Sequence, residues 1–263
     1  MKFLSKKFLW IVFSVAILAL AGYLVYRHFY SVLPQSSIEN MAEIQIKSSD
    51  RVLVFSPHPD DETIATGGAI VKAKNLGAKV EVVLVTDGNR RGLGAERRAE
   101  FQKVAEILGL SSSDLVFLNQ PEFYLAKKVS AADLSAMLKN QIDNFSPTII
   151  IYPDSSDQNP DHKFIGQTVK NLLPNYQNAS GYSYLVHSTF YPRPIGLHED
   201  KFLTPPKRLA NGNHNWQKLS LSQSEEDTKF QALSEYKTQL RTPILHELLV
   251  AMVRRNELFS RNN

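Results

Sequence analysis

The chain opens with one long apolar stretch and continues as short apolar runs that alternate with amphipathic segments. Residues 8–26 carry no charge and are long enough to cross a bilayer. Apolar runs predict strands at residues 52–56, 80–86, 115–118, 148–152 and 184–190. Helical periodicity and stop signals predict helices at about 63–76, 95–108, 131–145, 162–173, 222–240 and 244–257. The alternation predicts an α/β fold. We expect a Rossmann-like, mainly parallel sheet with helices on both faces, preceded by one N-terminal transmembrane helix.

Charges flanking the apolar stretch predict its orientation in a membrane. Lys2, Lys6 and Lys7 precede it, whereas only Arg27 and His28 follow it closely. The positive-inside rule then places the N-terminus in the cytoplasm and the remainder of the chain outside.

Three regions follow from this reading. Residues 1–30 are expected to be a membrane anchor, residues 31–48 a polar tether, and residues 49–263 one domain. The alternative is a cleaved signal peptide, since the Ala-Leu-Ala sequence at 19–21 fits a cleavage site. Apolar residues continue through 23–26, which favours the anchor. Either route exports the domain, as a membrane protein or as a secreted one.

The amino-acid composition limits the partners and the metal ligands that this chain can use. The chain has 30 basic and 26 acidic residues, and four of the basic residues lie before residue 31, where there is no acid. The rest is formally neutral, so no nucleic-acid partner is expected. There is no cysteine, so any metal must be held by histidine and carboxylate side chains.

A histidine and three consecutive acids, in the sequence His58-Pro59-Asp60-Asp61-Glu62, come directly after the first predicted strand. Open α/β sheets place ligands at this end of their strands. His58 and Asp61 are close enough to face one ion, and Asp60 could take a proton from the attacking water. Glu62 is expected to brace the loop. The alternative is that Asp60 and Asp61 merely cap the helix that follows.

A second polar loop, residues 153–162, follows the strand at 148–152 and ends in Asp161-His162. Loops after parallel strands lie at the same edge of a sheet, so His162 can supply a third ligand. The remaining histidines are interpreted as structural or surface groups, although two of them, at 198 and 214, could line the site; they are His28, His187, His198, His214 and His246.

These motifs resemble those of the PIG-L/LmbE-like deacetylases, zinc enzymes that remove acetyl groups from N-acetylglucosamine-containing substrates. The His-Pro-Asp-Asp-Glu motif is intact at 58–62, and a Pro-Asp-His motif stands at 160–162. Thr-Asp-Gly at 86–88, and Arg97-x-x-Glu100 ahead of Leu-Gly at 108–109, also match. The resemblance covers about residues 50–190.

The resemblance implies one zinc ion bound by three side chains, those of His58, Asp61 and His162. It implies Asp60 as the general base and Arg97 as a contact to the sugar substrate, with Glu122 as a weaker candidate. For Arg97, the residues alone favour a surface charge paired with a neighbouring acid. This ligand set also suits iron or cobalt.

One position departs from the family pattern. The family commonly has a histidine three residues before the last metal ligand, where this chain has Asn159. An amide can donate a hydrogen bond to an oxyanion but cannot pass on a proton. We therefore expect Asn159 to assist the oxyanion and Asp60 to protonate the leaving amine.

The expected function is a zinc-dependent hydrolase that removes the N-acetyl group from a glycan, glycolipid or conjugate containing N-acetylglucosamine, held at the membrane through residues 8–26. Two alternatives remain. One is a metal-dependent amidohydrolase acting on a non-sugar acylated substrate. The other is a catalytically silent glycan-binding module, which would not require Asp60.

Overall fold

The computed structural model describes residues 5–29, 31–210, 212 and 214–262. In this part of the chain seven strands form one sheet, in the order β3-β2-β1-β4-β5-β7-β6. The strands are β1 (Arg51–Ser56), β2 (Lys79–Thr86), β3 (Leu115–Gln120), β4 (Ile149–Pro153), β5 (Ser180–Tyr184), β6 (Asn215–Ser220) and β7 (Asn256–Asn262). β1 to β5 pair in parallel, whereas β7 pairs antiparallel with both β5 and β6. The predicted α/β fold with a mainly parallel sheet is confirmed.

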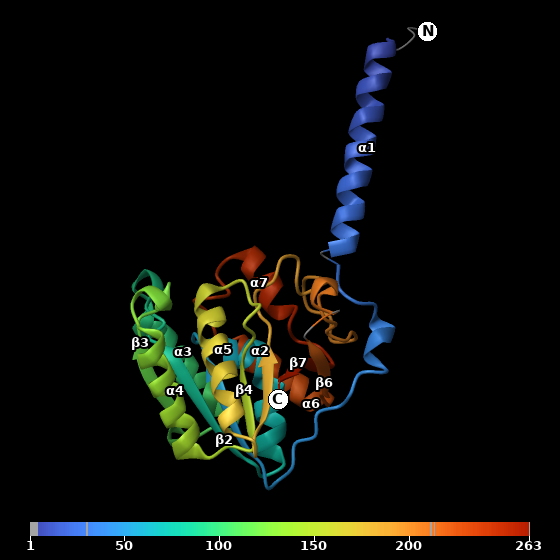
Figure 1. Cartoon of the computed structure of the whole chain (residues 1–263). Helices are drawn as coiled ribbons and strands as arrows, with labels where there is room; N and C mark the ends of the chain where they lie inside the picture. The colour runs from blue at the N-terminus through green and yellow to red at the C-terminus, as the bar shows by residue number, and fades with distance from the viewer. Residues whose placement is uncertain (1–4, 30, 211, 213, 263) are drawn as a thin grey trace.

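Helices cover both faces of this sheet (Figure 1). The helices are α1 (Lys6–Phe29), α2 (Asp61–Asn75), α3 (Gly94–Ile107), α4 (Ala131–Phe145), α5 (Pro160–Leu172), α6 (Gln223–Leu233) and α7 (Pro243–Val250). α2 and α3 each pack against α6 on one face, and α4 packs with α5 on the other. α1 projects away from the domain, and its 23 residues from Lys6 to His28 are long and apolar enough to span a membrane.

The central strand shows why the parallel strands read as unbroken apolar runs. In β1, Val52 and Val54 belong to the core beneath α2, α3 and α6. Leu53 and Phe55 point the other way, into the core beneath α4 and α5. A strand buried on both faces needs apolar residues at every position, so its sequence does not alternate.

The sequence-based assignment fails at the antiparallel side of the sheet. The strand expected at 184–190 ends at Tyr184, and residues 185–190 leave the sheet. The helices expected to reach about 240 and 257 end at Leu233 and Val250. β6 was not predicted, and β7 lies partly in a segment expected to be helical. β7 is buried on both faces from residue 256 to residue 260, and the buried positions include polar residues that hide the strand pattern; they are Asn256, Glu257 and Ser260.

Residues 31–48, expected to be a tether, pack against the domain. Ile38 and Ile44 are buried in the core. Glu43 accepts hydrogen bonds from the backbone N–H of Ser220, at 2.6 Å, and from its side-chain hydroxyl, at 2.8 Å. The boundaries at residues 30 and 48 stay a prediction.

A buried ion pair ties α2 to β7 and α6. Glu257 accepts a hydrogen bond from Lys229 Nζ at 2.7 Å, and both side chains are 1% exposed. The same carboxylate accepts the backbone N–H groups of Gly68 and Ala69, each at 2.8 Å. β7 therefore helps to fix the helix whose first turn carries Asp61.

We predict that Glu257→Gln lowers the free energy of unfolding by about 3–5 kcal/mol, because it leaves the Lys229 charge buried without a counter-ion. Urea titration in mild detergent measures this. Glu235→Gln, which breaks the surface pair with Lys103, should cost under about 1 kcal/mol. Equal losses of unfolding free energy in the two variants would contradict the role given to the buried Glu257–Lys229 pair.

Candidate metal centre and active site

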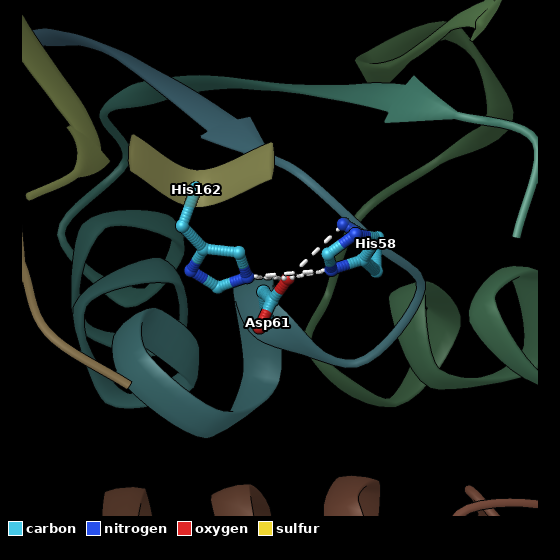
Figure 2. A group of neighbouring side chains, drawn as sticks. All are labelled: His58, Asp61 and His162. Carbon is cyan, nitrogen blue, oxygen red and sulfur yellow. Dashed lines mark hydrogen bonds and ion pairs between the residues drawn. The ribbon is translucent and has the colours of Figure 1, made fainter. Parts of the chain in front are cut away.

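Two strand-end loops meet at one edge of the sheet. β1 and β4 are parallel neighbours, with Val52 opposite Ile149, so the segments that follow them leave on the same side. His58 lies in the loop after β1, Asp61 begins α2, and His162 lies in the first turn of α5. Figure 2 shows the three side chains converging. The expected juxtaposition of the two loops is present.

α5 can approach the end of β4 closely because residue 166 is glycine. A Cβ on Gly166 would lie 2.2 Å from the carbonyl oxygen of Pro153, closer than any real contact. A larger residue would push the helix away from the strand, and His162 with it.

The three side chains present a donor set that fits a metal ion. Asp61 Oδ2 lies 3.1 Å from His58 Nδ1 and 2.9 Å from His162 Nε2. The two imidazole nitrogens are 3.3 Å apart. Zinc–ligand bonds of about 2.1 Å in a tetrahedron separate neighbouring ligand atoms by about 3.4 Å. The donor types, burial and spacing therefore suit a tetrahedral divalent cation.

Each imidazole has a second carboxylate behind it. His58 Nε2 lies 3.3 Å from Asp161 Oδ2, and His162 Nδ1 lies 3.4 Å from Asp157 Oδ2. Asp161 also accepts the backbone N–H groups of Phe123 and Leu125, which fix it. Such carboxylates orient metal-binding imidazoles and increase their basicity.

Glu62 braces the loop after β1 through hydrogen bonds, as expected. It is 1% exposed and accepts hydrogen bonds from the Asp60 backbone N–H at 3.2 Å and the Thr63 hydroxyl at 2.6 Å. The Tyr236 hydroxyl, in the segment after α6, also donates to it. A second support comes from Thr86, which donates to the carbonyl of Pro57 from its backbone N–H and its hydroxyl.

Asp60 is strained rather than acting as a cap. Its φ is +138°, a region that residues with a Cβ rarely occupy, at a cost of about 1–3 kcal/mol. It stands at the N-cap position of α2, yet its side chain makes no capping hydrogen bond. Its carboxylate instead lies 3.7 Å from Arg97 Nη2. The capping interpretation is therefore wrong for Asp60.

His58, Asp60 and Asp61 line a cavity of about 600 Å³ that is open to solvent. It is also bordered by groups from five other segments, among them Arg97, Glu122, Asn159, His187 and Leu245 of α7. A volume of this size accommodates a sugar.

Comparison with known proteins identifies the domain. Residues 53–173 match the family described as PIG-L, GlcNAc-PI de-N-acetylase.

Residues 53–173 therefore form a PIG-L-like domain.

Two relatives of this PIG-L domain carry named activities. Diacetylchitobiose deacetylase of Thermococcus kodakarensis is 29% identical over 146 residues, covering 49% of this chain and 53% of that protein. A deacetylase of Mycobacterium sp. strain KMS, named for 1D-myo-inositol 2-acetamido-2-deoxy-alpha-D-glucopyranoside, is 30% identical over 145 residues, covering 43% and 46%. The chain therefore spans about half the length of each.

Solved structures share the fold. N,N'-diacetylchitobiose deacetylase from Pyrococcus horikoshii superposes with a TM-score of 0.57 and 19% identity, covering 86% of each chain. At this identity the match shows the architecture alone.

Arg97 of the PIG-L domain is buried, not a surface charge. It is 4% exposed and donates to the Pro59 carbonyl at 3.1 Å, the Gly88 carbonyl at 3.2 Å and the Glu122 carboxylate at 3.0 Å. Gly88 has φ +64°, and a Cβ there would lie 2.7 Å from Pro59 Cγ. Arg97 thus binds the loop that carries Asp60 to the segment that carries Glu122.

Asn159 caps α5 and borders the cavity. Its Oδ1 accepts the backbone N–H of Asp161 at 2.9 Å. Within the described ranges its Nδ2 donates to no protein group, so the amide hydrogens remain available to a ligand.

His187 belongs to the site, contrary to its interpretation as a structural or surface group. Its ring packs edge-on against His162, with centroids 4.6 Å apart, and its Nδ1 lies 3.3 Å from Asp157 Oδ1. His198 and His214 do not border this cavity. His187 follows β5, so the signal that could have found it is its place after a parallel strand.

The pKa values of the two neighbouring carboxyl groups, Asp60 and Asp61, are shifted in opposite directions. Burial raises the pKa of Asp60 to about 8, and the charge of Asp61 adds to the rise while Arg97 opposes it. Burial also disfavours the charged form of Asp61, but His162 and His58 outweigh it and hold its pKa well below the usual value. Burial lowers the pKa of His58, yet hydrogen bonds to Asp161 and Asp61 prevail and raise it to about 9.

Metal binding should therefore release protons. Below about pH 9 a cation must displace the proton of His58, so we predict that zinc affinity rises about tenfold per pH unit for each proton displaced. Chelator competition between about pH 6.5 and about pH 8 measures this. An affinity that stays constant, after correction for the chelator's own protonation, would contradict it.

A matched pair of variants tests the cause. Asp161→Asn removes one carboxylate that raises the His58 pKa, so the pH slope should flatten and affinity at about pH 8 should fall about 10–100-fold. Asp227→Asn, on the exposed side of α6, should change neither quantity.

Proposed function

We propose that this protein is a zinc-dependent deacetylase that removes the N-acetyl group from an N-acetylglucosamine-containing glycan, glycolipid or conjugate. The observation that carries the proposal is the cluster of His58, Asp61 and His162, two of which line one cavity together with the Asp60 carboxylate. The named activities of the relatives of this PIG-L domain supply the substrate class.

His58, Asp61 and His162 would hold the cation. When bound there, a divalent cation supplies a Lewis acid that polarises the acetyl carbonyl and favours ionisation of water. Zinc suits two imidazoles and one carboxylate with an open position.

Asp60 moves the protons. Its carboxylate accepts a proton from the water whose oxygen attacks the acetyl carbon. The C–N bond then breaks, and Asp60 returns that proton to the leaving nitrogen, so the products are acetate and a free amine. A pKa raised by burial suits a group that must accept and then donate a proton.

Asn159 and Arg97 assist in different ways. The Asn159 amide borders the cavity and donates a hydrogen bond to the oxyanion that develops on the acetyl group. Arg97 faces the cavity from the other side. Its hydrogen bonds go to Pro59, Gly88 and Glu122, so we assign it chiefly to positioning Asp60 and Glu122, with sugar contact as its second role.

The anchor supplies the location. α1 holds the protein in a membrane with its N-terminus in the cytoplasm and the domain outside, by the distribution of positive charge around it. Cleavage at the Ala-Leu-Ala sequence of residues 19–21 would give a secreted form of the same domain.

Two other functions keep the same site but change the outcome. A non-sugar acylated amide would use the same residues. A silent glycan-binding module would need no proton acceptor, and the strained backbone of Asp60 argues against it, since strain persists where a function requires it.

The direct test is acetate release by the detergent-solubilised chain from N-acetylglucosamine monomers, oligomers and lipid-linked forms. Each assay is run after chelation and again after zinc is restored. Zinc-dependent release from at least one sugar supports the proposal. No release from any of them, by protein shown to hold zinc, would favour the non-sugar amide or the binding module.

We predict that Asp60→Asn lowers kcat by about 10²–10⁴-fold while zinc content stays at one ion per chain, because Asn cannot accept the proton. Acetate release and metal analysis on the same preparation measure this. Asp227→Asn removes the same charge from an exposed position and should keep full activity. If Asp60→Asn retains its rate, another group is the base.

We predict that Asn159→His raises kcat by about tenfold and adds an ionisation to the pH–rate profile, because an imidazolium is the stronger donor to an oxyanion. Asn159→Ser keeps a residue that caps α5 but shortens the donor, so its kcat should fall by about a hundredfold with little change in stability. An unchanged rate and pH profile in both variants would remove this position from the mechanism.

A further inference from the structure

Exposed apolar side chains gather at one end of the domain. Outside α1, the described residues include eight large hydrophobic side chains that are exposed: Leu76, Phe123, Tyr124, Phe190, Ile195, Leu197, Ile244 and Leu245. All but Leu76 lie in the segments that follow β3 and β5 or in the first turn of α7. Leu245 lines the cavity, and Phe123 lines a second hollow that shares His58 and Asn159 with it. Leu76 ends α2 at the opposite edge of the sheet. A cluster of exposed apolar side chains on a protein surface marks an interaction site.

This end of the domain is also where α1 departs (Figure 1). The Tyr26 ring, at the last turns of the apolar stretch, packs edge-on against Phe190 with centroids 5.2 Å apart. The backbone N–H of Lys207 donates to the Ser31 carbonyl at 2.7 Å, and that of Leu33 donates to Pro205 at 2.9 Å. The loop after β5 is therefore held at the level where α1 would leave a bilayer.

The same loop connects α1 to the cavity. Gly196 donates its backbone N–H to the Glu247 carbonyl of α7 at 2.8 Å, which brings Ile195 and Leu197 beside that helix. Leu245 of α7 lines the cavity that His58, Asp60 and Asp61 also line. We call Phe190, Ile195, Leu197, Ile244 and Leu245 the rim. Ile244 is 79% exposed and the other four are between 37% and 44% exposed.

Cationic side chains accompany the rim on the α1 side. Arg27 and Lys207 line one hollow between α1 and the loop, together with Leu24 and His28. The Arg193 guanidinium lies 5.4 Å from the centre of the Phe190 ring. Aromatic rings and basic groups with apolar stems are the side chains that settle at the boundary between lipid tails and phosphate headgroups.

We propose that the rim rests in the interfacial layer of the phospholipid bilayer that α1 spans, so that the cavity opens at the membrane surface. The rim residues insert among the headgroups, and Arg27, Arg193 and Lys207 meet the lipid phosphates. A mouth at this level admits a sugar attached to a membrane lipid, a consequence that rests on the proposed function. The bilayer contact itself does not.

The absence of cysteine makes the contact measurable in the full chain. Single cysteines at Ile195, Ile244 and Leu76 are labelled with a nitroxide, and each protein is reconstituted in phosphatidylethanolamine–phosphatidylglycerol vesicles. Paramagnetic resonance then compares the access of oxygen with that of a water-soluble nickel chelate. Labels at 195 and 244 should favour oxygen and report a depth of about 5–10 Å, whereas the label at 76 should favour nickel.

Either of two results would overturn the proposal. Nickel access at 195 and 244 equal to that at 76 would place the rim in water. Protection from both reagents, with dipolar broadening that grows with the protein-to-lipid ratio, would show that a second copy of the chain covers the rim.

A double variant tests whether the rim inserts into the bilayer or only lies close to it. Ile195→Asp with Ile244→Asp should lift the rim, so a label at Leu197 should lose its oxygen preference while zinc binding and the circular dichroism spectrum stay unchanged. Leu76→Asp should leave the Leu197 label as it is. Because no step requires acetate release, failure of the rim contact and failure of the deacetylase proposal are read independently.

Discussion

Parallel pairing of β1 with β4 is the constraint on which the site depends. It sends the two polar loops out on one side of the sheet, although their metal-site residues are about a hundred positions apart in sequence. Close packing of α5 against the end of β4 at Gly166 then fixes the distance of His162 from the strand ends. Neither loop would make a cluster alone. Two ligands from one loop and one from the other converge because adjacent parallel strands keep the two loops side by side.

Burial of so many ionisable groups is costly, and the arrangement around the cluster shows how the cost is offset. Asp61 lies between two imidazoles, and each imidazole has its own acid behind it, in Asp161 or Asp157. Opposite charges thus alternate across the site. Asp60 is the exception, since the charges of Arg97, at 3.7 Å, and His58 do not outweigh its burial, and its pKa stays raised. The one carboxylate with poor compensation is the one that the proposed chemistry requires to change its charge.

Sequence predicted the parallel half of the fold because burial on both faces leaves a strong local signal, as in β1. It predicted the meeting of His58, Asp61 and His162 because strand ends define an edge. It missed β6 and β7, whose buried polar residues find partners far away in the sequence, such as Lys229 for Glu257. It missed His187 for a related reason. The strand before it was placed four residues too late, so the position of this histidine at the sheet edge was not visible. Arg97 likewise looked like a surface charge, because its partners Pro59 and Gly88 offer only backbone carbonyls.

The place of β7 in the sheet affects how the protein is made. β7 lies between β5 and β6, so β6 has no neighbouring strand until residues 256–262 have left the ribosome. The parallel strands can associate earlier, yet α2 still lacks the carboxylate that holds Gly68 and Ala69. During synthesis, an incomplete sheet edge would therefore stay exposed until these residues are added. Such an intermediate is a natural substrate for holding chaperones, and its lifetime depends on the rate of elongation rather than on the stability of the finished domain.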